Sequence, residues 1–369
     1  MPPRRIVAII AAALAFGMSD TLSADAAQWS IVPSPNHAGA SSDALSGVSC
    51  ISSSFCMTVG GWSSASRGKP LIEKWNGSNL TTLSAPVPSG APESWLSGVA
   101  CISTHFCMAV GRAYPGGDGA VSLIEQWNGS KWSLSKQAPN QGGYWLLTGV
   151  SCKSTSFCMA VGSYTLNGDP NGYSFAERWN GLEWASEYLP GNYGDELYGV
   201  SCPTAGSCMA VGDGLAGTLI EQWNGASWAI SSFSTPGTLL GVRCRATNFC
   251  WAVGETPGEA TDTEQPLAVT WNGAAWSIVG TADPGSYGRL EGVTCVSTTE
   301  CIAAGSDSVG TLIEQWSGSG GWAAMPSASS SSANLLYSVS CAVTGTAMFC
   351  IATGTTGSTT GSKTLAEKY

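Results

Sequence analysis

The sequence predicts an all-β fold, a seven-bladed β-propeller with four antiparallel strands per blade, whose ring is closed by an N-terminal strand that completes the last blade. Three observations predict this fold. Seven pairs of cysteines recur about every fifty residues. Each repeat contains four strand-like segments, which is the content of a propeller blade. The last repeat lacks its fourth segment, and a segment of that kind stands near the N-terminus instead.

The N-terminal residues have the composition of a secretory signal peptide. Two arginines precede the apolar run 6–16, and the small residues at 24–26 offer a cleavage site. The apolar run is too short to span a bilayer. We therefore expect a signal peptide at 1–26 and a single propeller domain at 27–369, secreted to the extracellular space or the cell envelope. A retained membrane anchor is the alternative, and no membrane span is expected in the mature chain.

The next segment is expected to supply the closing strand. Gln28-Trp-Ser-Ile-Val-Pro-Ser34 resembles the segments around Trp132-Ser-Leu134 and Trp276-Ser-Ile278, which are fourth strands of their repeats. The chain ends at Leu365-Ala-Glu-Lys-Tyr369, the counterpart of the third-strand segment Leu123-Ile-Glu-Gln-Trp127. A linear solenoid has no need of such a split repeat. A ring closed by its own N-terminus leaves no broken edge between the first and last blades.

The second repeat shows how each blade is expected to form. The segment 96–101 alternates as a first strand does, and Phe106-Cys-Met-Ala-Val110 is apolar throughout, as expected for a strand buried on both faces. The third strand is predicted at 122–127. Asn128-Gly129 then predicts a two-residue hairpin, because a type I′ turn needs positive φ, and the fourth strand follows at 131–135.

All fourteen cysteines can pair within their own repeats. Secretion takes the chain into an oxidising compartment, and a pair that joins the first two strands of a blade across a short loop already has its Cα atoms close. A zinc site is the weaker alternative, because the chain has no C-x2-C motif and only two histidines, His37 and His105. The predicted disulfides are Cys50–Cys56, Cys101–Cys107, Cys152–Cys158, Cys202–Cys208, Cys244–Cys250, Cys295–Cys301 and Cys341–Cys350.

Composition argues against several partners and chemistries. The net charge is −10 and no basic run is present, which argues against nucleic acid or anionic lipid as a partner. His105 lies in a cysteine loop and His37 in a linker, which argues against a Ser-His-Asp triad or a multi-histidine metal centre. The loops 116–119 and 169–172 could bend around Ca²⁺ but lack oxygen ligands at EF-hand spacing, so a bound Ca²⁺ stays open. We expect no metal centre, no cofactor and a monomer.

The repeated run Gly-Val-Ser-Cys … Cys-Met-Ala-Val-Gly … Glu-Gln-Trp-Asn-Gly-x-x-Trp resembles a widespread type of secreted bacterial β-propeller repeat. Proteins of that type carry tandem "WNG–W" blades and mostly lack an assigned activity, so the resemblance implies the fold rather than a function. It extends over essentially all of the mature chain. Sialidase Asp-boxes and the Gly-His … Trp-Asp signature of WD40 blades are absent. A loose similarity to propeller lectins transfers no sugar-binding motif.

Residues that recur in nearly every blade are expected to be scaffold, because a single functional centre breaks the symmetry of the repeat. The repeated tryptophans are expected to pack between blades, with one sugar pocket per blade as the alternative. The repeated third-strand glutamates are expected to hydrogen-bond to neighbouring backbone or to an indole N–H. The glutamates are Glu73, Glu125, Glu177, Glu221, Glu314 and Glu367. The tryptophans are Trp29, Trp75, Trp127, Trp132, Trp179, Trp184, Trp223, Trp228, Trp271, Trp276, Trp316 and Trp322.

In a propeller, the loops between second and third strands share one face with the connections between blades, and here both kinds of loop vary in sequence. We call this side the variable face, and the side with the cysteine loops and Asn-Gly turns the cysteine-loop face. Function concentrates on variable loops held by a rigid frame. Non-repeated aromatic residues in blades 1 to 4 could stack on a sugar ring or an aromatic partner, or only pin the long loops. The predicted ligand-binding residues are Trp62, Trp95, Tyr144, Trp145, Tyr193 and Tyr198.

Charge breaks the repeat just before the first strand of two blades, near the expected mouth of the channel. Most blades have small or apolar residues there, whereas blade 4 has Glu196-Leu-Tyr198 and blade 6 has Arg289-Leu-Glu291. Two facing carboxylates could serve glycoside hydrolysis, and a Tyr–Arg arrangement could serve a polyuronate lyase. A solvated loop rim has the same residue types. If the protein is an enzyme, the predicted catalytic residues are Glu196, Tyr198, Arg289 and Glu291.

The sequence therefore predicts a secreted, non-enzymatic binding module whose variable face engages a carbohydrate or an extracellular protein. Clustered aromatic residues and few titratable groups favour this function. An extracellular polysaccharide hydrolase or lyase with its site at the channel mouth is the alternative. A structural envelope protein with no small ligand is a third hypothesis.

Overall fold

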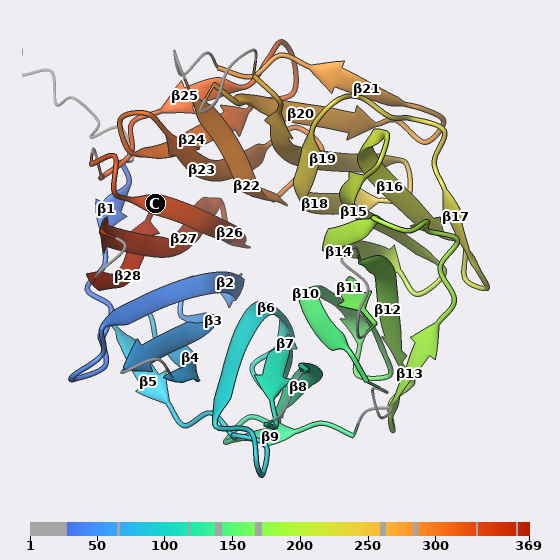
Figure 1. The fold of residues 1–369 in the computed structure, drawn as a ribbon. Helices are drawn as coiled ribbons and strands as arrows, with labels where there is room; N and C mark the ends of the chain where they lie inside the picture. Colours follow the sequence, from blue (N-terminus) through green and yellow to red (C-terminus); the bar gives the residue numbers. More distant parts are fainter. Residues whose placement is uncertain are drawn as a thin grey trace, which may run out of the picture.

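The computed structural model describes residues 28–64, 67–116, 119–136, 142–166, 172–258, 263–282, 287–329, 331–358 and 361–369. The predicted signal peptide and parts of both candidate Ca²⁺ loops lie outside the described residues. The described chain forms seven four-stranded antiparallel sheets, arranged as blades around a central channel (Figure 1). This arrangement confirms the predicted seven-bladed propeller. Among the described residues there is no helix that could span a membrane.

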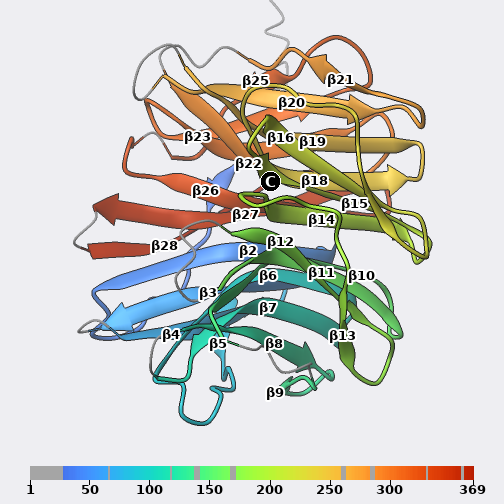
Figure 2. The ribbon, with the colours of Figure 1, turned by 45° about the vertical axis from the view of Figure 1, so that its right-hand side comes forward.

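The blades follow one another around the ring in chain order, each with its first strand at the channel (Figures 1 and 2). Blade 1 consists of β2 (Ser42–Ser52), β3 (Phe55–Ser64), β4 (Arg67–Trp75) and β5 (Leu80–Leu83). Blade 2 consists of β6 (Glu93–Ser103), β7 (Phe106–Tyr114), β8 (Val121–Trp127) and β9 (Trp132–Leu134). Blade 3 consists of β10 (Tyr144–Ser154), β11 (Phe157–Thr165), β12 (Tyr173–Trp179) and β13 (Trp184–Glu187). Blade 4 consists of β14 (Glu196–Thr204), β15 (Ser207–Gly214), β16 (Gly217–Trp223) and β17 (Trp228–Ile230).

The remaining blades repeat the pattern. Blade 5 consists of β18 (Thr238–Ala246), β19 (Phe249–Thr256), β20 (Gln265–Trp271) and β21 (Trp276–Val279). Blade 6 consists of β22 (Gly288–Cys295), β23 (Cys301–Asp307), β24 (Thr311–Trp316) and β25 (Ala323–Met325). Blade 7 consists of β26 (Leu335–Thr344), β27 (Ala347–Ser358), β28 (Gly361–Lys368) and, from the N-terminus, β1 (Ser30–Ile31).

The ring is closed by the N-terminal strand, as the split repeat predicts. Strand β1 pairs antiparallel with β28, with Ile31 opposite Glu367, and the two strands lie side by side in Figure 1 although they come from opposite ends of the chain. The indole of Trp29 lies 5.6 Å from the ring of Tyr369, centroid to centroid. Trp29 is buried in the core of blade 7. The first described residues therefore complete the blade that the last residues leave open.

The second strand of each blade is buried over most of its length, as its apolar sequence predicts. In β7 the residues from Phe106 to Gly111 are all buried. The glycine that ends this run is required by close approach of the backbone: a Cβ on Gly111 would lie 2.0 Å from the carbonyl oxygen of Trp95 on β6. The equivalent glycines are as tightly placed, namely Gly60, Gly162, Gly212, Gly254, Gly305 and Gly354. The repeated Ala-Val-Gly motif therefore sets the spacing between the first two strands.

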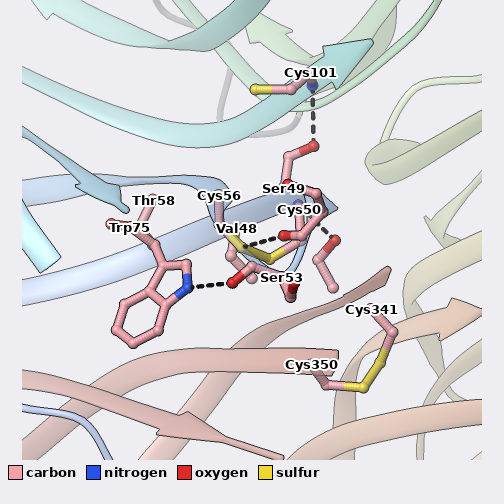
Figure 3. Close-up of a disulfide and its surroundings, with 12 residues drawn as sticks. Val48, Ser49, Cys50, Ser53, Cys56, Thr58, Trp75, Cys101, Cys341 and Cys350 are labelled. Carbon is pink, nitrogen blue, oxygen red and sulfur yellow. Dashed lines mark hydrogen bonds between the residues drawn. A yellow bond between two sulfur atoms is a disulfide. The ribbon is translucent and has the colours of Figure 1, made fainter. Parts of the chain in front are cut away.

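The seven predicted disulfides are all present, and the described residues contain no free cysteine. Each joins the first strand of a blade to the second across a short loop, as Figure 3 shows for Cys50–Cys56. The Cα atoms of that pair are 4.0 Å apart. A loop this short is expected to contribute about 2 kcal/mol per disulfide in the chain-entropy model. The disulfides therefore reinforce the edge of each blade on the cysteine-loop face.

The repeated tryptophans belong to the frame. Trp127 and Trp132 of blade 2 pack in one core with Phe55 and Met57 of blade 1, so they lie between blades as predicted. The third-strand indole N–H groups donate to carbonyl oxygens of the cysteine loops, as in Trp75 to Ser53 (2.9 Å; Figure 3). Equivalent bonds are made by Trp127, Trp179, Trp223 and Trp271.

Adjacent blades are also joined through a hydroxyl that lines the channel. The backbone N–H of Cys101 in blade 2 donates to Ser49 Oγ in blade 1 (3.0 Å; Figure 3). The hydroxyls that accept such a bond are those of Ser49, Ser151, Ser201, Thr294 and Ser340. Blade 2 has Ala100 at this position and blade 5 has Arg243, so two of the seven blade junctions lack this bond.

Ser151→Ala is expected to lower the free energy of unfolding by about 1 kcal/mol, because it leaves the N–H of Cys202 without its acceptor. Ala100→Ser is expected to have the opposite, smaller effect, because it offers an acceptor to the next blade. Urea titration measures both changes. The control is Ser186→Ala on the exposed outer strand of blade 3, which should change stability by less than about 0.5 kcal/mol. Equal effects of the Ser151 and Ser186 variants would refute this role of the hydroxyl.

Candidate functional site

The channel mouth on the variable face is lined by three successive residues from the first strand of each blade. The second is a glycine or serine and the third a valine, whereas the first differs between blades. Together they enclose about 170 Å³. Four blades contribute a small or aliphatic side chain, namely Ser46, Ser97, Thr148 and Leu240. The other three contribute Tyr198, Glu291 and Tyr337. The symmetry of the repeat is therefore broken on one side of the mouth, by blades 4, 6 and 7.

The charged side chains predicted from the sequence form two local pairs at this mouth. On β14, the hydroxyl of Tyr198 donates to the carboxylate of Glu196 (3.1 Å). On β22, the guanidinium of Arg289 forms an ion pair with Glu291 (2.8 Å). Residues two apart on a strand lie on the same side of it, which is why each pair meets. Because Tyr198 and Glu291 line the same cavity, the two pairs share one site.

Further carboxylates reach this site from neighbouring strands. Asp213 on β15 lies opposite Glu196 in the strand register, and Glu255 on β19 lies opposite Thr238 at the start of β18. The charges of Asp213 and Glu255 both act on Tyr198. Among the described residues, the one cation that acts on Glu255 is Arg289. The mouth therefore holds more negative than positive charge.

The environment of these groups resists ionisation of the carboxyls. Burial raises the pKa of Glu291 to about 6, with Arg289 opposing the shift and Glu255 adding to it. Burial also raises the pKa of Asp213, and the nearby Glu196 raises it further. For Arg289 the effect of burial is to lower the pKa, but Glu291 and other neighbours outweigh it, so the pKa is raised. The guanidinium therefore stays charged while the carboxyls around it repel one another.

Four aromatic rings form a continuous ladder on the variable face of blade 3. Trp145 stacks on Tyr164 (centroids 4.4 Å apart, planes at 8°), and Tyr164 stacks on Tyr173 (5.4 Å, 24°). Tyr173 then meets Tyr193 edge-on at 5.6 Å. The rings come from β10, β11, β12 and the connection into blade 4. We call Trp145, Tyr164, Tyr173 and Tyr193 the aromatic ladder.

The aromatic ladder ends beside the channel mouth. The N–H of Gly194, next to Tyr193, donates to the carbonyl oxygen of Gly172 (2.7 Å). A Cβ on Gly172 would lie 3.3 Å from a carboxylate oxygen of Glu196. Tyr193 is 36% exposed to solvent. The ladder and the acidic mouth therefore form one continuous surface across blades 3 and 4.

The other predicted aromatic residues are not part of the aromatic ladder. Trp95 has the register position in β6 that Glu196 has in β14, two residues before a residue that lines the mouth. The guanidinium of Arg112 lies 5.5 Å from the ring centroid of Trp95. Trp62 stacks on the ring of His37 at 3.6 Å. Tyr144 is exposed at the start of β10. These intramolecular contacts of Trp95 and Trp62 are the ones expected of rings that pin long loops.

The predicted site residues thus fall into three groups. Glu196, Tyr198, Arg289 and Glu291 lie at the mouth. Trp145 and Tyr193 lie in the aromatic ladder. Trp62 and Tyr144 lie outside both groups, whereas Trp95 lies at the edge of the mouth in blade 2, at the register position of Glu196.

Sequence reasoning did not place Asp213, Glu255 and Tyr337 at the mouth. For the two carboxylates a signal was present. Each stands directly after the repeated glycine of the second strand, where the other blades have Gly61, Arg112, Ser163, Ser306 and Thr355. Because the glycine pairs with the first strand beside its bulge, the next residue lies near the mouth.

The repeated glutamates are fully buried, but their partners differ from blade to blade. Glu73 and Glu221 accept from the hydroxyls of Ser34 (2.8 Å) and Ser174 (3.0 Å), as expected for scaffold. Glu314 accepts from a backbone N–H, and Glu367 accepts from hydroxyls and a backbone N–H. Within the described residues, Glu125 and Glu177 have no hydrogen-bond partner, and the expected bond from an indole N–H is not found. Burial raises the pKa of Glu125 to about 9 and that of Glu177 to about 7.

Comparison with known proteins identifies the fold and no family. No family model matches the chain, and no curated protein matches it. Solved structures do match: YCF48 from Cyanidioschyzon merolae has a TM-score of 0.55 and 14% identity, over 93% of this chain and 99% of that chain. YCF48 bound to D1 peptide has a TM-score of 0.59 and 12% identity, over 94% and 96% of the two chains. U3-55K has a TM-score of 0.58 and 11% identity, over 93% and 98%. At these identities the likeness supports the propeller fold alone.

Proposed function

We propose that this protein is a secreted binding module that holds a positively charged segment of an extracellular protein at the mouth of its channel. The observation that carries the proposal is the imbalance of charge at that mouth. The carboxyls that act there are Glu196, Asp213, Glu255, Glu264 and Glu291, with Arg289 as the cation among them.

A lysine or arginine from a ligand would relieve the repulsion within this group. Burial and like charges raise the pKa values of Glu255 and Glu291, so ionising these carboxyls costs free energy in the unbound protein. A cation placed among them favours the ionised forms and makes charge-assisted hydrogen bonds. A cavity of about 170 Å³ has room for a side chain and not for a domain. The rest of the ligand segment would therefore lie on the variable face.

The aromatic ladder offers the next contact surface. It adjoins Glu196, so an extended segment anchored at the mouth would cross Tyr193 and Tyr173 on leaving it. Aromatic rings supply apolar contact area and attract cations to their faces. Acidic groups followed by aromatic rings suit a segment with basic and apolar residues close together.

Two further observations support the proposal. A solved propeller of similar fold, YCF48, is described as bound to D1 peptide, so a peptide is a ligand for at least one propeller of this outline. Seven intrachain disulfides fit an oxidising, extracellular location, in line with the signal peptide expected at 1–26.

Immobilised protein comprising residues 27–369 is expected to enrich peptides that contain lysine or arginine from a random displayed library at pH 7.5. The Glu255→Gln/Glu291→Gln double variant is expected to bind an enriched peptide at least about tenfold more weakly, because it removes two of the charges. Binding should weaken with added salt. It should strengthen as the pH rises through about 6, where Glu291 ionises. Fluorescence anisotropy of the labelled peptide measures each change.

The control is Glu300→Gln, which removes one carboxylate from a loop of the cysteine-loop face and should leave the affinity unchanged. Enrichment of acidic or uncharged peptides, or an equal effect of Glu300→Gln, would count against the proposal. A glycan array run in parallel tests carbohydrate as the ligand. Glycan binding that is lost in Tyr193→Ala and kept in the double glutamine variant would replace the peptide by a carbohydrate.

A polysaccharide hydrolase or lyase is the second candidate, and the pKa of Glu291 favours it. A carboxyl with a pKa of about 6 can donate a proton near neutral pH, and Glu196 would be the second carboxyl of the site. In that case Glu291→Gln should abolish the release of sugar ends from a polysaccharide panel with little change in melting temperature. Peptide binding without turnover of any polysaccharide in the panel would exclude this candidate.

A further inference from the structure

The half of the channel that opens toward the cysteine-loop face is lined by a valine from each blade, by hydroxyls and by one guanidinium. It encloses about 200 Å³, several times the ~30 Å³ that one water molecule takes in the liquid. Blade 5 contributes Arg243 to its wall. One hydroxyl in the wall belongs to Ser338. The other five belong to the residues that accept the N–H of a first cysteine in the next blade, namely Ser49, Ser151, Ser201, Thr294 and Ser340.

Each of these five hydroxyls still has a proton to donate. Their oxygens accept the backbone N–H of a first cysteine, as Ser201 does from Cys244 at 2.9 Å. A hydroxyl that accepts one bond keeps its own O–H as a donor. No residue in the described part of the chain accepts a hydrogen bond from any of the five. The ring therefore offers five O–H donors to whatever lies in the channel.

Arg243 is a cation without a counter-ion in this wall. No carboxylate in the described ranges forms an ion pair with it. Burial is the largest cause that lowers the pKa of Arg243, and the neighbouring cation Arg245 lowers it further. Within the described ranges, no other charged group acts on Arg243. The guanidinium stays protonated at neutral pH, because an arginine side chain keeps its proton in proteins. Arg243 is one of the residues that line the cavity, and part of its surface is accessible there.

The arginine also breaks the repeat. A hydroxyl at position 243 would join blade 5 to the N–H of Cys295, as happens at five other junctions, and the guanidinium forgoes that bond. Arg243 therefore makes no hydrogen bond to the N–H of Cys295 and instead places an unpaired guanidinium in the channel. Departures of this kind from the local pattern are expected at functional sites.

We infer that Arg243 and the hydroxyl ring bind a small oxyanion, such as phosphate or sulfate, within the channel. The fork of a guanidinium matches two oxygens of such an anion, and the hydroxyls supply donors to the others. The site lies below the acidic mouth. The two cavities share a ring of valines and Ser338, but Arg243 and the five hydroxyls line only the lower one, so the site is independent of the function proposed for the variable face.

Isothermal titration calorimetry with inorganic phosphate and with sulfate tests this site, using residues 27–369 in a chloride buffer of constant ionic strength. Saturable binding of one anion per chain is expected. Arg243→Ser should weaken it at least about tenfold. The same variant should melt at a higher temperature than the wild type without phosphate, because its hydroxyl can accept the N–H of Cys295. Arg243→Gln, which removes the charge alone, is the second variant and should also lose binding.

Lys153→Ser is the matched control. It removes the same charge from the same face, at a residue that does not line the cavity, and should bind phosphate within about twofold of the wild type. The Glu255→Gln/Glu291→Gln variant should also bind phosphate normally, whatever becomes of the peptide. Sulfate stabilises proteins generally by exclusion from their surface, and that effect is equal in all variants. No saturable binding by the wild type, or equal binding by Arg243→Ser, would overturn the inference.

Discussion

Trp29→Ala is expected to lower the free energy of unfolding by about 3–5 kcal/mol, as is usual when a buried tryptophan is truncated. Trp29 is 5% exposed and packs against Tyr369 in the core that Leu365 shares. Its loss removes that burial and loosens the strand that covers the edge of β28. Because this strand closes the ring, the loss should also make the last blade more accessible. Urea titration gives the free energy, and limited proteolysis locates the opened segment.

Ile31→Ala is the matched control for this prediction. Ile31 lies in β1, two residues after Trp29, but it is 57% exposed. Its truncation should change stability by less than about 0.5 kcal/mol. Equally small changes in the free energy of unfolding for both variants, with unchanged proteolysis of the last blade, would show that the closing strand does not stabilise the ring.

Glu125→Gln is expected to stabilise the protein at pH 8 by an amount on the order of 4 kcal/mol. Burial raises the pKa of Glu125 to about 9, and no described residue hydrogen-bonds to its carboxyl. The folded state therefore binds a proton that the unfolded state, with a pKa near 4.5, has released. This contribution to stability is complete below pH 4.5 and is lost as the pH rises through about 9. The neutral amide removes that loss, so melting temperatures of the two proteins should agree near pH 4.5 and diverge as the pH rises.

Glu367→Gln is the matched contrast, at the same position of another blade. Its carboxylate accepts hydrogen bonds from Ser327, from Thr311 and from the backbone N–H of Ala328. The amide of glutamine would place its own N–H groups against groups that also donate hydrogen bonds. The unmatched donors should lower the free energy of unfolding by about 1–3 kcal/mol. Opposite signs for the two glutamines at pH 8 are therefore expected. Destabilisation of similar size by both would show that Glu125 is ionised and paired in the folded protein.

The fold could be predicted from the sequence because its determinants are local and repeated. The C-x5-C spacing places Cys101 opposite Cys107 across one short loop, so each disulfide needs only two neighbouring strands. The apolar second strand and the glycine after it are likewise set within one blade. The closure of the ring was readable because the missing fourth strand and its substitute, around Trp29, both appear in the sequence. Because each blade repeats the same local pattern, the fold can be predicted without knowing which distant residues contact one another.

The candidate site could be predicted only where its residues are neighbours in sequence. Glu196 and Tyr198, or Arg289 and Glu291, are two apart, and the geometry of a strand brings each pair together. The meeting of blades 4, 5 and 6 at the mouth depends on strand register and on the tilt of whole blades. That is why Glu255 was not placed beside Arg289 from sequence, although the two interact in the fold.

The partners of the buried glutamates show the same division. Their burial follows from the repeat, because every third strand has the same place in its blade. Their hydrogen bonds come from loops outside the repeat, as with Ser34 for Glu73 and Ser327 for Glu367. Such loops differ in length and sequence between blades, so the pattern of the strands does not predict which glutamate stays without a partner.

Hydrogen–deuterium exchange with and without a selected basic peptide tests most directly whether the ligand is held at the acidic mouth. The predicted result is slower exchange in the connection 190–195 and at the beginnings of β14 and β22, near Tyr198 and Glu291. Exchange in the cysteine loop 153–156 should not change. Protection confined to the cysteine loops, with none at the mouth, would contradict the account.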